Sequence, residues 1–322
     1  MTLIGQVRRT IFGIPVEEAT VARRGFHTSD SRVAERLERI GMEFLSGYHM
    51  AMEEPMAGPL AARLNGAVSL QDRGFVFEGA AMGLFLLDRV GLSRRAFASF
   101  LKGPGQPHIY MLHIGAGWAV ARLPWLRLRW PAVLASFDPL LRWLVVDGWG
   151  FHEGYFHWPA AIRRHTLPRG LSGYAARAFD QGLGRSLWFV DGIDLDRIAS
   201  SISGFPAHRH NDLWAGVGLG CAYAGGANPL ALADLAALAG VHAPAAAQGA
   251  AFAAEARHRA RNPAADCDLA CRGLCGISAD AAAAIARETR MNLPPDGAIP
   301  GYEVWRARLQ QHFLRAPQGV CQ

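Results

Sequence analysis

Apolar residues recur along this chain at helical spacing, whereas the alternating pattern of a half-buried strand is scarce. Val33, Leu37, Ile40 and Phe44, for example, stand three or four residues apart, as on one face of an amphipathic helix. Ala, Leu and Arg, which all favour helix, dominate the sequence. The pattern predicts an all-α protein with little sheet.

A glycine within an apolar segment recurs about every 34 residues, which is the length of one helix–turn–helix unit in tetratricopeptide-like arrays. A small residue is needed in such units because two helices approach closely there. The gaps are unequal, and Pro124, Pro131 and Pro139 interrupt the third interval, so we expect an irregular assembly of helical hairpins. Chance recurrence among 36 glycines is the alternative. These motif glycines are Gly47, Gly79, Gly115, Gly154, Gly182, Gly216 and Gly249.

Capping and helix-breaking residues predict several helix boundaries. We expect helices over residues 196–203, 230–238, 280–290 and 302–314. Asn228 and Pro229 are typical of a helix start, and Gly240 is typical of a helix end. Asn211 or Asp212 is expected to cap the helix that follows Pro206.

The length allows one large domain or two small ones, and we expect one continuous domain. The 322 residues, of which 51% are hydrophobic and 19% charged, allow a sizeable core and exclude an intrinsically disordered chain. We expect an N-terminal amphipathic segment over 1–45, a helical-repeat core over 46–260 and a cysteine-containing helical cap over 261–322.

The charge pattern argues against a nucleic-acid partner. The formal net charge is +6, but Lys102 is the only lysine and the arginines are scattered, with no run of five like charges. Residues 1–22 lack the features of a secretory signal. The longest uncharged stretch, 213–233, contains five glycines and predicts a buried helix and a turn. We therefore expect a cytoplasmic protein without an integral membrane segment.

The glycine-containing segments also resemble a known family over nearly the whole chain. The segments that carry the resemblance are RGFVFEGAAMG, IYMLHIGAGWAVARLPW, LRWLVVDGWGFHEGYFH, DQGLGRSLWFV, DLWAGVGLGCAYAGG, QGAAFAAEARHRA and GYEVWR. They are similar to a bacterial family of unknown function described as enediyne biosynthesis proteins, whose genes stand beside the enediyne polyketide synthase. Members also occur outside recognised enediyne clusters. The resemblance implies a role in enediyne-type polyketide biosynthesis, with proteins of the same gene cassette as candidate partners, and it assigns no reaction and no catalytic residue.

Polar residues stand just before the motif glycines. If the predicted units stack, equivalent positions fall on one surface, and these residues would form a polar row in an otherwise apolar groove. The alternative is that each is a buried polar group bonded to a neighbouring helix. The residues are Glu78, His113, His152 with Glu153, Asp180 with Gln181, and Gln248.

The segment from Asp147 to Trp158 is the richest in chemistry. Glu153 and His157 are four residues apart and share a helix face, as a metal pair or an acid/base couple requires, whereas His152 should point about 140° away from His157. A mononuclear metal site and aromatic packing with capped histidines both stay open. The sequence therefore predicts catalytic groups at His152, Glu153 and His157, with Glu78, His113 and Asp180 as secondary members, in a space bounded by Phe77, Trp118, Phe151, Tyr155 and Trp188.

Other cofactor signals are weak. Cys267, Cys271 and Cys275 would lie down one helix face about 6 Å apart per step, a spacing that differs from zinc ribbons and common iron–sulfur motifs. We expect these thiols to be dispensable for folding. No glycine-rich phosphate loop stands between a predicted strand and helix, so no nucleotide cofactor is indicated, and the sequence leaves any cofactor or metal unknown.

Two functions remain open from the sequence. The first is an enzyme that acts on a hydrophobic polyene-derived intermediate in an apolar groove. The second is a non-catalytic helical-repeat scaffold or carrier that holds such an intermediate or binds partner enzymes.

Overall fold

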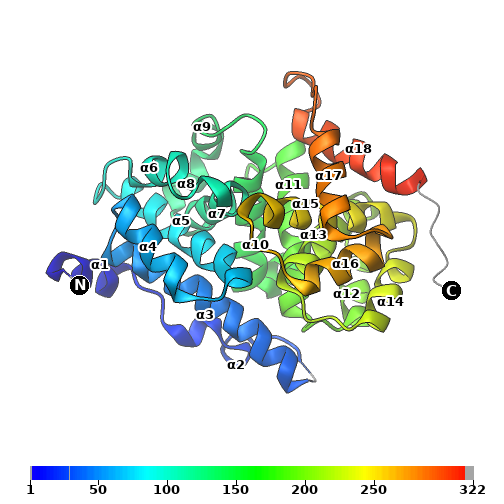
Figure 1. Cartoon of the computed structure of the whole chain (residues 1–322), viewed down its shortest axis with the longest axis horizontal. Helices are drawn as coiled ribbons and strands as arrows, with labels where there is room; N and C mark the ends of the chain where they lie inside the picture. The colour runs from blue at the N-terminus through cyan, green and yellow to red at the C-terminus, as the bar shows by residue number, and fades with distance from the viewer. Residues whose placement is uncertain (1, 29, 316–322) are drawn as a thin grey trace.

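The computed structural model describes residues 2–28 and 30–315, and over these residues the protein is all α-helical, with no strand. Figure 1 shows the N-terminal helices at one end of the molecule and the C-terminal helices at the other. The prediction of an all-α fold is confirmed. Cys321 lies outside the described residues.

Seven long helices form an inner layer, and each packs against the next in chain order. Most of their residues from the second helix onward are buried, because these helices have neighbours on every side. The inner helices are α3 (Ser31–Glu53), α5 (Arg73–Arg89), α7 (Ile109–Arg122), α10 (Trp143–Phe156), α11 (Tyr174–Val190), α13 (Ala207–Ala224) and α15 (Ala243–Ala260).

The remaining helices cover the outside of this layer, and all of them except α18 are shorter than the inner helices. They are α1 (Leu3–Phe12), α2 (Val21–Arg24), α4 (Ala57–Ala67), α6 (Ala96–Lys102), α8 (Pro124–Leu128), α9 (Trp130–Leu134), α12 (Leu195–Ser203), α14 (Pro229–Ala239), α16 (Ala265–Cys275), α17 (Ala279–Thr289) and α18 (Gly301–Arg315).

The motif glycines lie within helices, at the points where inner helices touch. A Cβ atom on Gly47 would overlap the carbonyl oxygen of Val76 on α5, and a Cβ atom on Gly79 would overlap the carbonyl oxygen of Phe44 on α3. Gly115, Gly182, Gly216 and Gly249 meet backbone carbonyl oxygens of neighbouring helices in the same way, whereas Gly154 meets the Ser186 side chain on α11. The prediction that these positions require a small residue at a close helix contact is confirmed.

Most inner helices carry a second glycine two residues away from the first. Successive helical residues are rotated by about 100°, so the two glycines of a Gly-x-Gly pair face nearly opposite directions. On α10, Gly148 faces Ile114 of α7 while Gly150 faces Phe179 of α11. The pair therefore lets one helix approach both of its neighbours.

On α10, the glycines at the close backbone contacts with both neighbouring helices are Gly148 and Gly150 rather than Gly154. The uneven gaps around Gly154 in the sequence arise from this difference, because Gly154 lies further along the same helix and contacts Ser186. The connections between inner helices are unequal: α8 and α9 both follow α7, while a π-helical turn (Pro159–Arg163) follows α10. A tetratricopeptide-like period stays a prediction.

The predicted helices over 196–203, 230–238, 280–290 and 302–314 correspond to α12, α14, α17 and α18. The predicted cap of α13 is wrong. This helix begins at Ala207, directly after Pro206, so Asn211 and Asp212 lie inside it. Asp212 accepts hydrogen bonds from Arg177 instead. The boundary expected after residue 45 falls inside α3, and one hydrophobic core extends from Ile14 to Phe313.

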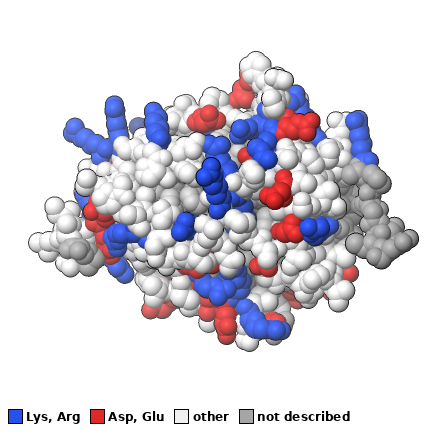
Figure 2. All heavy atoms as spheres, viewed as in Figure 1, with Lys and Arg blue, Asp and Glu red and all other residues white. Residues whose placement is uncertain are grey.

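The surface carries scattered charge. Figure 2 shows basic and acidic side chains mixed among uncharged ones on one face. One helical stretch of the described chain, Pro229–Ala260, has the length and apolar composition of a membrane span, with 33% of its most apolar window buried. This stretch comprises α14 and α15, which a short 3₁₀ turn (Gly240–His242) joins. Core helices of globular domains share these properties.

Candidate functional site

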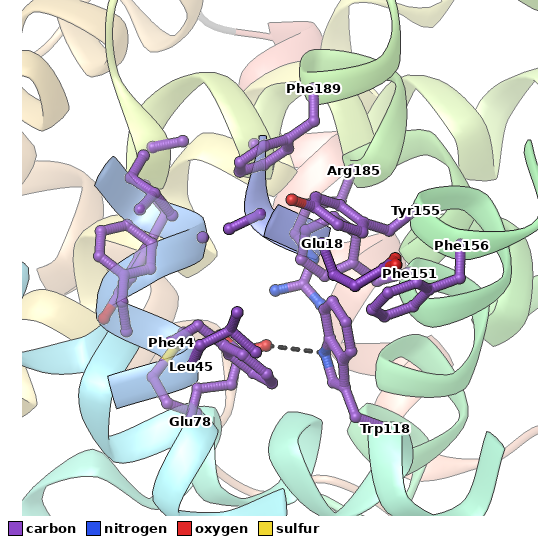
Figure 3. Close-up of a pocket in the computed structure, with 18 residues that line it drawn as sticks. Glu18, Phe44, Leu45, Glu78, Trp118, Phe151, Tyr155, Phe156, Arg185 and Phe189 are labelled. Carbon is purple, nitrogen blue, oxygen red and sulfur yellow. Dashed lines mark hydrogen bonds between the residues drawn. The ribbon is translucent and has the colours of Figure 1, made fainter. Parts of the chain in front are cut away.

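The inner helices enclose an aromatic-lined cavity, and α3, α5, α7, α10, α11 and α13 all contribute to its wall. The space between these side chains amounts to about 630 Å³, including its opening. Figure 3 shows aromatic rings from several helices turned toward this space. The aromatic residues that line it are Phe44, Phe75, Trp118, Phe151, Tyr155, Phe156, Phe189 and Tyr223.

The Gly-x-Gly pairs determine which side chains face this cavity. The residue directly before a pair and the residue directly after it project to nearly the same side of the helix, between the two neighbouring helices. Trp118, Phe151 and Arg185 each follow a pair, and all three line the cavity. Asp147 and Gln181 each precede a pair and approach the same buried space from α10 and α11.

Glu78 is a buried carboxyl group in the wall of the cavity. The indole Nε1 of Trp118 donates a hydrogen bond of 3.0 Å to Glu78 Oε1 (Figure 3). Burial raises the pKa of Glu78 from its ordinary value of 4.5 to about 7, although the Arg185 guanidinium opposes this shift. Both the neutral and the charged form of Glu78 are therefore populated near neutral pH.

Arg185 supplies a positive charge to the same space. Its Nη2 atom donates a hydrogen bond of 2.8 Å to Asp147 Oδ1, and its guanidinium carbon lies 4.3 Å from the centre of the Phe151 ring. The Gln181 amide donates to Asp147 Oδ2 at 2.8 Å and to the Tyr302 hydroxyl at 3.1 Å. These bonds hold the guanidinium in one orientation. The cavity therefore combines aromatic faces with one guanidinium group and two carboxyl groups, those of buried Glu78 and of partly exposed Glu18.

The structure brings His152, Glu153 and His157 together at the end of α10. Glu153 Oε2 lies 2.9 Å from His157 Nδ1, and Glu153 Oε1 lies 3.5 Å from His152 Nδ1. The expectation that His152 points away from His157 is wrong, because α10 ends at Phe156 and the His157 backbone is no longer helical. The ring of Phe156, 4.9 Å from that of His152, lines the cavity and lies next to this cluster.

Two secondary residues lie elsewhere. His113 Nδ1 is 2.7 Å from the carbonyl oxygen of Ile109. Asp180 accepts a hydrogen bond of 2.9 Å from Arg209 Nε in a buried ion pair. Both residues stand two positions before a motif glycine. On a helix this position is rotated by about 100° from the residue directly before the glycine, which faces inward. The six predicted residues therefore do not share one groove, and among them only Glu78 lines the cavity.

The predicted aromatic boundary is correct in part. Trp118, Phe151 and Tyr155 line the cavity as expected. Phe77 instead stacks on the His108 ring with 4.0 Å between centroids, and Trp188 donates a hydrogen bond of 2.9 Å to the carbonyl oxygen of Gly225. Both face other parts of the core.

The three spaced cysteines lie on α16 and are buried. The Cys275 thiol is directed at the carbonyl oxygen of Ala247, 3.3 Å away, and that of Cys271 at Ala250 on the same helix, α15. A hydrogen bond with Cys271, together with burial, raises the pKa of Cys267. The thiols thus serve as packing groups between α15 and α16.

The fold and the cavity define a class of protein: an all-α protein whose inner helices, joined at glycine contacts, surround an aromatic space with a buried carboxyl and guanidinium group. Residues 3–313 match the model of a family described as a protein of unknown function (DUF1702). The chain belongs to this family. No curated protein and no solved structure matches the chain.

Proposed function

We propose that the protein holds a hydrophobic polyene-derived intermediate of enediyne-type polyketide biosynthesis in the central cavity, and that Glu78 exchanges a proton with it. The observation that carries the proposal is the placement of the buried Glu78 carboxyl group in a space lined mostly by aromatic and aliphatic side chains. The resemblance of the sequence to enediyne biosynthesis proteins supports the pathway.

The lining suits a flat, conjugated molecule. Aromatic rings offer apolar faces on which a polyene can lie. The Arg185 guanidinium projects among the labelled rings in Figure 3, where it can bind a polyketide oxygen. The ligand would thus be oriented at one polar end and held by dispersion elsewhere.

Glu78 suits proton exchange because a general acid or base works best when its pKa lies near the working pH. Its only hydrogen bond from a described residue comes from Trp118 Nε1 to one oxygen, so the other oxygen is available to a ligand. A catalytic role for His152, Glu153 and His157 stays a prediction, and these residues lie outside the cavity.

Binding can be tested with 1,6-diphenylhexatriene, a rigid conjugated probe whose fluorescence rises when it leaves water. Met111 lines both this cavity and a smaller apolar space beside α15, so Met111→Trp should fill the space and weaken binding at least about tenfold. The matched control is Met56→Trp, at a position that is 65% exposed. Equal affinity of the wild-type protein and both variants would contradict binding in the cavity.

Chemistry can be tested separately with Glu78→Gln, which keeps the shape and cannot ionise. If Glu78 transfers a proton, a deletion strain that carries this variant should accumulate the substrate while the purified variant still binds the probe. Full complementation by a folded Glu78→Gln protein would contradict proton transfer by Glu78. It would favour the second function that the sequence left open, a carrier that holds the intermediate without catalysing a reaction.

A further inference from the structure

We propose that His152, Glu153 and His157 bind one divalent transition-metal ion of the Zn²⁺ type. This inference is independent of the proposed role of the cavity. All three residues belong to the last turn of α10 and its cap, so a single element positions the whole ligand set. One ligand atom from each residue lies within 4.8 Å of the other two, the only such group among the described residues.

The separations between the ligand atoms suit a tetrahedral ion. Zinc bonds of about 2.0–2.2 Å to nitrogen and oxygen place neighbouring tetrahedral ligands roughly 3.3 Å apart. The distance from Glu153 Oε2 to His157 Nδ1 is 2.9 Å, and that from Glu153 Oε1 to His152 Nδ1 is 3.5 Å. Small side-chain rotations would therefore bring one carboxylate oxygen and two imidazole nitrogens around one ion.

Unpartnered buried atoms point to the same conclusion. The His152 side chain is only 6% exposed, and its Nδ1 atom faces Glu153 Oε1 at 3.5 Å without the geometry of a hydrogen bond, while neither atom has a hydrogen-bond partner elsewhere among the described residues. Buried polar atoms without partners are uncommon in folded proteins, and a bound ion is one reason for them. A metal ion would use the free electron pairs of both atoms.

His49 and Glu53 provide an internal comparison, because they have the spacing of Glu153 and His157 in reversed order. Their polar atoms are occupied: the backbone N–H of Ile14 donates to His49 Nε2 at 3.2 Å, and Arg63 donates to Glu53 at 2.7 Å. Arg9 also pairs with Glu53. The spacing alone is therefore not sufficient, and the open partners at the end of α10 distinguish that site.

Solvent can complete the coordination. The His157 side chain is 55% exposed, so one side of the cluster is open to water. Three protein ligands with a fourth, open position are typical of catalytic rather than structural zinc sites. The positive charges of Arg24, Arg122 and Arg127 face the histidines and lower the affinity. Arg24 is offset by its ion pair with Glu18, at 2.9 Å.

The test uses the full-length protein after metal removal, titrated with Zn²⁺ by calorimetry and with Co²⁺ by visible absorption, whose intense bands report tetrahedral coordination. We expect one equivalent of either ion. Glu153→Gln and His157→Ala should each weaken binding by more than about 100-fold, beyond the loss for groups that only orient a ligand. The matched control is His258→Ala, which removes a surface histidine 3.8 Å from Asp280 without a third ligand nearby.

Two further variants test whether the ion binds at this cluster. Arg127→Gln should tighten Zn²⁺ binding, because it removes a positive charge that faces His157. Met111→Trp, which fills the cavity, should leave Zn²⁺ binding unchanged. A wild-type protein that binds neither ion would show that Glu153 and His157 form a simple ion pair. Binding that survives in folded His157→Ala and is lost when Cys267 and Cys271 are replaced would place the ion at the thiols, and either result would overturn the proposal.

Discussion

Replacing one glycine at a helix contact by alanine should separate α10 from α11. A Cβ atom on Gly182 would overlap the carbonyl oxygen of Asp147 and would lie 2.6 Å from its carbonyl carbon. Carbon atoms in contact normally rest about 3.5–4.0 Å apart. The obstacle is backbone, which cannot rotate away as a side chain can, so the two helices must move apart by roughly 1 Å.

The expected cost is the difference between two effects. Overpacking costs about 1–3 kcal/mol, and the displacement also stretches the buried bonds that Asp147 accepts from Gln181 and Arg185, each at 2.8 Å. Alanine recovers about 1 kcal/mol through its higher helix propensity. We expect Gly182→Ala to lower the free energy of unfolding by about 2–4 kcal/mol, which corresponds to a fall in Tm of roughly 3–6 °C for a chain of 322 residues.

Gly66→Ala is the matched control. Gly66 is an exposed residue of α4, and a Cβ atom there meets nothing within 4 Å, so this variant should gain up to about 1 kcal/mol. Thermal unfolding followed by circular dichroism gives the sign for both variants. A folded Gly182→Ala protein whose Tm equals or exceeds that of the wild type would refute the argument that this glycine is required for close helix contact.

Three further predictions concern the buried polar groups. Because the native pKa of Glu78 is about 7 and its ordinary value is 4.5, the native state binds this proton more tightly than the unfolded state, so wild-type stability should fall as the pH rises between these values. The free energy of unfolding of the wild type should fall by up to about 3 kcal/mol over this pH range, and that of Glu78→Gln should not; thermal melting of both proteins across the range measures the difference. Asp180→Ala should cost about 3–5 kcal/mol, measured by urea unfolding, because it leaves the Arg209 charge buried without a partner. Burial raises the pKa of Cys221, so this thiol should react with a thiol reagent only after denaturant is added, and rapid reaction in the native protein would contradict its burial.

The fold class follows from the sequence because the helical signal is local. The spacing of apolar residues and the presence of a glycine within an apolar segment can both be seen in the sequence of a single helix. The two predictions drawn from them, helices and close helix contacts, hold in the structure. The start of α13 was missed because capping is a competition among nearby residues. Pro206 lies directly before the helix, and the Asp212 side chain is occupied by Arg177.

The site was predicted only in part because its partners are distant in the sequence. Asp180 pairs with Arg209, 29 residues away, and Gln181 donates a hydrogen bond to Tyr302, 121 residues away. A local sequence pattern cannot show that the Asp180 pair lies away from the cavity while the Gln181 bond lies close to it. Arg185 was missed altogether. Its signal is its position directly after the second glycine of a pair, a place that also holds Trp118 and Phe151.

The glycine contacts and the cavity are consequences of the same arrangement. Where two backbones touch at a Gly-x-Gly pair, no side chain separates them, so the large residue that follows the pair must project into the space that the helices enclose. Trp118, Phe151 and Arg185 enter the cavity in this way from three successive inner helices. Widening a single contact would therefore shift the rings and the charge that line the cavity, and helix packing and ligand recognition would change together.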